Sequence, residues 1–113
     1  MTDEQRRNVL DGASLEIEQL ERLIQACRQM QDELRVSLAL MNEGNTMTTI
    51  LSRGGTSGVI PQLTEALDRT NASRRVGRTN MIRLALAEGM TTTQLGERLG
   101  ISRQLVARYR DGG

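Results

Sequence analysis

Large apolar side chains recur every three or four residues between Ser14 and about Asn42. This spacing, without any interrupting proline, predicts a long amphipathic helix over the segment. Ser14 supplies a hydroxyl oxygen that can accept from the free amides of the first turn. Gly12 is expected to break the pattern, so that residues 2–12 form a frayed turn or a short separate helix.

Two heptad series share one face of this predicted helix, and they define an apolar stripe. Its members are Ile17, Leu20, Ile24, Cys27, Gln31, Leu34, Leu38 and Met41. Leu23 and Met30 widen the stripe, and Gln31 is a polar interruption that would lower stability while selecting one pairing. A helix of about 28 residues would extend about 42 Å, which a small domain cannot readily cover. We therefore expect the stripe to join two copies of the chain; packing against the protein's own later helices is the other interpretation.

The middle of the chain is rich in residues that disfavour helices. Residues 43–60 are rich in Gly, Thr, Ser and Asn and predict a linker, with room for one helical turn around Met47, Ile50 and Leu51. Pro61 suits the first turn of a connecting helix that continues to about Thr70.

Near the C-terminus, the stretch LGERLGISRQLVARYR predicts two short helices that meet at a corner. Gly100 interrupts an otherwise amphipathic pattern, which favours a turn with positive φ, and Ser102 can cap the second helix. Gly96 would lie where the two helices come closest. The apolar residues then fall where the pair must bury side chains: Leu95, Leu99, Ile101, Val106 and Tyr109. A preceding helix over 79–88, ended by Gly89, offers Ile82 among other apolar residues to the same core.

The segment TTQLGERLGISRQLVARYRD resembles the bacterial helix-turn-helix family, and the three helices together are similar to the minimal domains at the C-termini of resolvases and invertases. Gly96 departs from the alanine usual at its place in that family. The resemblance implies that the second helix, from Ser102 to Arg110, enters the major groove of double-stranded DNA. It implies base contacts by Arg103 and Gln104, whose side chains can bind guanine and adenine in a bidentate way.

The other candidate DNA contacts follow from the same resemblance. On the outward face of the second helix they are Ser102, Ala107 and Arg108 beside the two base readers. Candidate contacts to the phosphate backbone are Thr92, Thr93, Gln94, Arg98 and Arg110. The stretch SRRVGRT places Arg74, Arg75 and Arg78 around Gly77, and it is similar to the flexible basic arms that enter the minor groove beside such domains. A merely solubilising linker is the other interpretation of this stretch.

The composition excludes several kinds of catalytic and metal site, and the distribution of charge indicates a polyanionic partner. The chain of 113 residues has no His and one Cys, which excludes Ser-His-Asp triads, thiol–imidazole pairs and the common zinc sites, so we expect no enzyme activity, cofactor or metal. Residues 1–68 hold six Arg against eleven acids, a net of −5, and residues 69–113 hold nine Arg against three acids, a net of +6. Such asymmetry is typical of a tail that binds polyanions. With no apolar span or signal peptide in sight and no ligand pocket expected, we predict a cytoplasmic, nucleoid-associated protein.

These observations predict an all-α protein with a long N-terminal dimerisation helix and a small C-terminal helix-turn-helix domain. The expected divisions are an association region at 1–42, a linker at 43–60, a connecting helix and basic arm at 61–77, and the DNA-binding domain at 78–113. The first functional hypothesis is a homodimeric, sequence-specific transcription regulator. The alternatives are an architectural or segregation protein that coats or bridges DNA, and an accessory DNA-binding subunit of a recombination or phage-packaging system.

Overall fold

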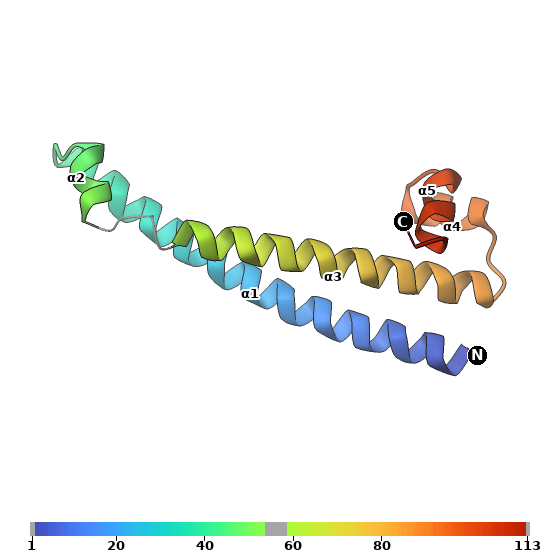
Figure 1. Ribbon diagram of the computed structural model, residues 1–113. Helices are drawn as coiled ribbons and strands as arrows, with labels where there is room; N and C mark the ends of the chain where they lie inside the picture. Colours follow the sequence, from blue (N-terminus) through green and yellow to red (C-terminus); the bar gives the residue numbers. More distant parts are fainter. Residues whose placement is uncertain (1, 54–58, 113) are drawn as a thin grey trace. The chain divides into compact units, whose positions relative to one another are not determined.

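The computed structural model describes residues 2–53 and 59–112, and all secondary structure in these residues is helical (Figure 1). The helices are α1 (Thr2–Asn42), α2 (Met47–Ser52), α3 (Val59–Ala87), α4 (Thr92–Leu99) and α5 (Arg103–Arg110). The predicted all-α class is confirmed. Residues 54–58 of the predicted linker lie outside the described residues.

The described residues fall into two compact units to which α1 and α3 both contribute. The terminal unit comprises residues 2–17 and 72–112, and the central unit comprises residues 18–53 and 59–71.

A small apolar core holds the terminal unit together. Ile82 of α3, Leu95 of α4 and Val106 of α5 are buried against one another. Partly buried apolar side chains surround them: Ala85, Leu86, Met90, Leu99, Ile101 and Tyr109. The residues predicted to form the core of the C-terminal helices therefore do so. Gly89, with φ of 110°, follows the end of α3 as predicted.

Gly12 does not break α1, which is one helix of 41 residues. The glycine instead faces α3, where a Cβ built on it would lie 3.8 Å from the Cα of Gly77 and 3.3 Å from Nδ2 of Asn80. Asn80 Nδ2 donates to the carbonyl oxygen of Asn8 at 3.3 Å. Gly12 thus lies in contact with the backbone of α3, and this packing offsets the low helix propensity of glycine inside α1.

The predicted end at Thr70 and the predicted flexible arm are also corrected, because α3 continues through both to Ala87. Thr70 Oγ1 donates to the carbonyl oxygen of Ala66 at 2.8 Å, as a hydroxyl does inside a helix. Ser73 and Gly77 are buried in the terminal unit, so tertiary packing overrides their poor helix propensity. A helix is about 10–12 Å wide and cannot follow a minor groove about 6 Å wide as an extended arm does.

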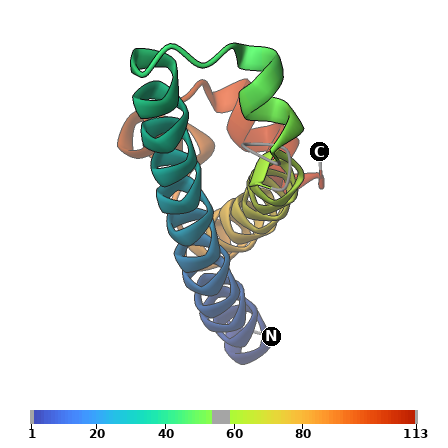
Figure 2. The same cartoon turned by 90° about the vertical axis from the view of Figure 1, so that its left-hand side faces the viewer.

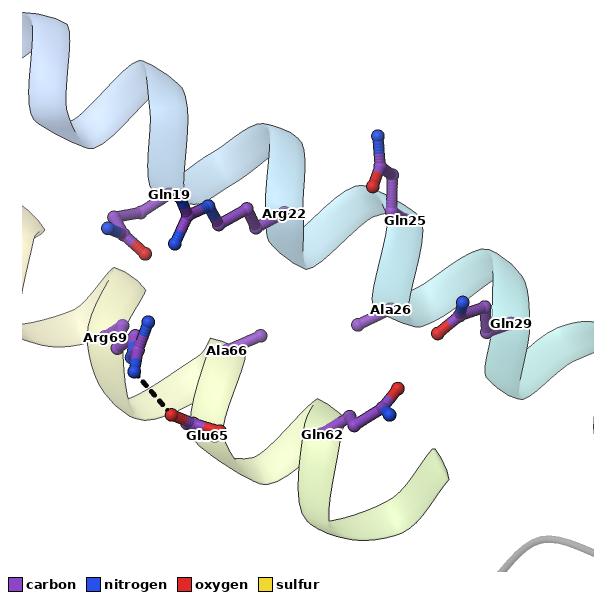
Figure 3. Close-up of a pocket in the computed structure, with 9 residues that line it drawn as sticks. All are labelled: Gln19, Arg22, Gln25, Ala26, Gln29, Gln62, Glu65, Ala66 and Arg69. Atoms are coloured by element: carbon purple, nitrogen blue, oxygen red, sulfur yellow. Dashed lines mark hydrogen bonds and ion pairs between the residues drawn. The ribbon is translucent and has the colours of Figure 1, made fainter. Parts of the chain in front are cut away.

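In the central unit, α1 packs on α3 along a seam of small, polar and partly buried apolar residues. Ala26 of α1 and Ala66 of α3 face one another, and glutamines and arginines stand around them (Figure 3). Thr70 is buried, and its Oγ1 reaches the carbonyl oxygen of Gln19 at 3.4 Å. The pocket between the helices is lined by Gln19, Arg22, Gln25, Ala26, Gln29, Gln62, Glu65, Ala66 and Arg69. Along this seam, Ala26 is the one apolar residue in the buried class among the described residues that α1 and α3 contribute to the central unit.

The short helix α2 connects the two long helices of the central unit, descending from the end of α1 towards the start of α3 (Figure 2). Thr46 caps it by accepting from the amide of Thr49 at 3.2 Å. Ile50 is buried. The helical turn predicted around Met47, Ile50 and Leu51 is thus confirmed.

The predicted heptad stripe does not face α3. In the central unit the partly buried or buried positions of α1 are Gln19, Leu23, Ala26, Met30, Glu33, Ser37 and Leu40, each one residue before a stripe position. The large apolar stripe residues Leu20, Ile24, Leu34, Leu38 and Met41 are exposed by 40–61%. The chain's own α3 therefore packs against α1 along the side that holds Leu23 and Met30, while most of the heptad positions stay exposed.

Candidate nucleic-acid interface

The helix α4 begins with a reciprocal cap. Thr91 Oγ1 accepts from the amide of Gln94 at 3.1 Å, and Gln94 Oε1 accepts from the amide of Thr91 at 3.0 Å. Two of the amides that a helix start leaves unpaired are thereby satisfied. The sequence analysis missed Thr91, although the spacing of threonine and glutamine in TTTQ is the usual signal for this cap.

A sharp corner joins α4 to α5, as predicted. Gly100 has φ of 69° and ψ of 31°, in the left-handed region where a Cβ would be strained. The amide of Ile101 donates to the carbonyl oxygen of Gly96 at 2.9 Å and closes the turn. Gly96 is buried at the closest approach of the two segments, which confirms its predicted place.

The start of α5 is capped and its first turn is open to solvent. Ser102 Oγ accepts from the amide of Leu105 at 3.1 Å, as expected of a cap. Val106 is fully buried and anchors the helix on the core. Arg103 and Gln104 are exposed, and Arg108 lies one turn after Gln104 and is exposed as well. Ala107, one turn after Arg103, is half-buried. The structure therefore brings the predicted base readers together on the outward face of one anchored helix.

The residues predicted to contact backbone have mixed environments. Thr93, Gln94 and Arg98 are exposed on α4, whereas Thr92 is half-buried. The cap engages Oε1 of Gln94 as an acceptor, and the amide nitrogen of the same side chain can donate outward.

Arg110 is engaged at the end of α5. Its Nε donates to Oδ1 of Asp111 at 3.0 Å, and this hydrogen bond is the main reason why the pKa of Asp111 is lowered and that of Arg110 is raised. The carbonyl oxygen of Arg110 also accepts from Nε of Arg83 at 3.0 Å. Sequence reasoning missed Arg83, because only the fold brings α3 to the end of α5.

The three predicted arm residues lie on the part of α3 that belongs to the terminal unit. Arg74 and Arg75 are exposed. Arg78 is half-buried, and its guanidinium carbon lies 5.9 Å from the centre of the Tyr109 ring on α5. At this distance a cation–π contact ties α3 to the outward helix. Arg78 thus has a packing role that its place in the predicted basic arm did not suggest.

Among the described residues, no group of three or more His, Cys, Asp and Glu side chains is placed to hold a metal ion. Nor does any helix in this part of the chain combine the length and apolarity needed to cross a bilayer. No protein-family model, no curated protein and no solved structure matches the chain.

Proposed function

We propose that the chain is a sequence-specific DNA-binding protein whose helix α5 enters the major groove, and that it acts as a homodimeric transcription regulator. One observation carries the proposal above the others: the left-handed corner at Gly100 holds a capped helix whose first turn presents Arg103 and Gln104 to solvent. An arginine and a glutamine so placed match the donor and acceptor patterns of guanine and adenine in that groove.

Charge supports a polyanionic partner for the terminal unit. No acidic residue lies in α5, which contains Arg103, Arg108 and Arg110. The helix start adds a partial positive charge that attracts phosphate oxygens. Positive potential at exposed arginines releases counterions from DNA on binding, so the affinity is expected to fall steeply with added salt.

The proposal includes a dimer because one small DNA-binding domain would bind DNA only weakly. A domain of this size buries little surface on DNA, and linking two raises the effective concentration of the second at its half-site. The proposed association surface is the exposed stripe of α1.

Selection of binding sites from random duplex DNA tests the proposal. The wild-type chain is expected to enrich one motif, and Arg103→Ala is expected to lose about 1–3 kcal/mol of discrimination at one base position. Arg22→Ala, which removes the same charge from an exposed position of the central unit, serves as the matched control and should keep the motif. Failure of the wild type to bind duplex DNA in dilute buffer, or an unchanged motif with Arg103→Ala, would contradict the proposed role of α5.

Footprinting separates regulation from the coating of DNA. One protected site on a fragment supports a regulator that reads an operator. Protection that spreads along unrelated fragments would instead favour an architectural protein that uses the same helices.

A further inference from the structure

The central unit exposes more large apolar side chains than it buries. Ile50 is its one large apolar residue in the buried class among the described residues, whereas Leu34 and Leu38 of α1 are exposed by 48% and 61%. An exposed apolar face of this kind, with polar residues around it, marks an interaction surface.

The helix α3 adds to the same face. Each stripe residue of α1 follows a partly buried or buried residue by one position. On α3, Ile60 and Leu67 likewise follow Val59 and Ala66, which are partly buried. In two antiparallel right-handed helices, a step of one residue away from the shared seam turns both side chains towards the same side of the pair. Ile60 and Leu67, exposed by 48% and 44%, therefore join the α1 stripe in one surface, which we call the apolar face.

We infer that the apolar face docks on the same face of a second copy, with the two α1 helices antiparallel, so that the central units form a four-helix bundle. This arrangement sets Leu20 level with Leu38 of the second copy, and Ile24 level with Leu34. Both stripes are then covered along their whole length in the central unit. The polar Gln31 lies beside Cys27 of the second copy.

Charge selects the antiparallel direction. The heptad position that flanks the stripe on its outer edge is occupied by Glu21, Arg28 and Arg35. In an antiparallel pair of helices, this position of one helix lies beside the same position of the other helix. Glu21 then lies near Arg35 of the second copy, and two such ion pairs outweigh the single approach of the two Arg28 side chains. In a parallel pair, Glu16 of one helix would lie beside Glu21 of the other, and no flanking residues of opposite charge would be neighbours.

The inference deepens the dimer that the proposed function includes. Its test uses no DNA, so its failure is separate from a failure of the proposed DNA binding.

Disulfide formation in the full chain tests the direction. In a Cys27→Ala background, one preparation carries Leu20→Cys and another carries Leu38→Cys. Mild oxidation of the mixture should give about tenfold more covalent dimer than oxidation of either variant alone, because a disulfide requires Cα atoms within about 7 Å. Two copies of residue 20 would lie about 27 Å apart along an antiparallel pair. Equal crosslinking of Leu20→Cys alone, or a strictly monomeric wild-type chain in sedimentation, would overturn the inference.

A charge exchange provides a second measurement that leaves the apolar residues in place. Arg35→Glu should weaken the dimer about three- to tenfold, because it sets two glutamates beside one another in each of the two pairs. The exchange Glu21→Arg with Arg35→Glu should restore the wild-type dissociation constant, although both variants also lose the contact of Arg35 with Asp32 on the same helix. A double variant no tighter than Arg35→Glu would count against the antiparallel pair.

Discussion

Gly96 and Ile101 face each other across the corner between α4 and α5. A Cβ atom built on Gly96 would lie 2.7 Å from the carbonyl oxygen of Ile101, closer than Cβ atoms approach a backbone oxygen. A backbone oxygen cannot turn aside as the end of a side chain can, so any residue with a Cβ must shift the corner.

We therefore expect Gly96→Ala to destabilise the terminal unit by up to about 2 kcal/mol, because overpacking costs about 1–3 kcal/mol and helix propensity returns about 1 kcal/mol. Urea unfolding measures the change. Glu97→Ala, at an exposed position of the same helix, is the control and should stay within about 0.5 kcal/mol of the wild type. A stabilised Gly96→Ala would mean that the helices do not approach as described.

Gly100 tests the backbone of the corner apart from its packing. A Cβ there meets no atom within 4 Å, so the cost of a substitution comes from φ alone. Gly100→Ala should lower the free energy of unfolding by about 1 kcal/mol, while Gly100→Asn should cost less because asparagine tolerates the left-handed region. Thermal melts of the two variants compare them directly. Equal stability of the alanine variant and the wild type would contradict the left-handed corner.

At Gly77, unlike at Gly96 and Gly100, alanine is expected to stabilise the protein. The nearest atom to a Cβ at this position is Oε1 of Glu16 at 3.0 Å, and this flexible end can swing away. Gly77→Ala should therefore stabilise the protein by about 0.5–1 kcal/mol through helix propensity. Gly12→Ala is the matched comparison and should gain less, since it meets the Asn80 amide that is held by the carbonyl of Asn8. If Gly77→Ala left the stability unchanged, the segment around Gly77 would be the flexible arm and not part of a helix.

In the proposed complex with DNA, Asp111 would compete with phosphate for the guanidinium of Arg110. Asp111→Asn removes the carboxylate and should tighten DNA binding about two- to fivefold at low salt, whereas Glu88→Gln, an equal change of charge before α4, should have a smaller effect. Fluorescence anisotropy with a labelled duplex measures both. If the two variants behave alike, only net charge is at work and Arg110 is not held back by its neighbour.

The same pair predicts a pH dependence of stability. Because the pKa of Asp111 is lowered in the folded protein, its contribution is present above the carboxyl's unfolded pKa and is lost as the pH falls through the lowered value. Acid titration of the unfolding free energy should therefore decline less steeply for Asp111→Asn than for the wild type. Parallel titration curves would show that the contact with Arg110 does not persist in solution.

The sequence predicted the C-terminal helices well because their signals are local. A glycine that interrupts an apolar pattern, a serine two residues later and apolar residues at helical spacing depend only on neighbours within a few positions. Gly100, Ser102 and Val106 accordingly have the roles expected of them. The DNA contacts proposed for Arg103 and Gln104 stay a prediction until a site is selected.

Two features of the structure could not be predicted from neighbouring residues in the sequence. The continuity of α3 through Ser73 and Gly77 depends on close packing against residues of α1 that are distant in sequence, and the link between Arg83 and Arg110 depends on how α3 and α5 meet. Propensity alone disfavours a helix at such positions, and tertiary contact reverses the balance.

The sequence by itself determined that α1 is an amphipathic helix with a regular apolar stripe, because that periodicity is a property of the chain. Only the tertiary structure decided which face of α1 meets α3. The physical reason lies in contacts between residues that are far apart in the chain. Ala26 faces Ala66 (Figure 3), and Thr70 Oγ1 reaches the carbonyl oxygen of Gln19, so the helices pair along the positions one step before the stripe and leave Leu34 and Leu38 exposed.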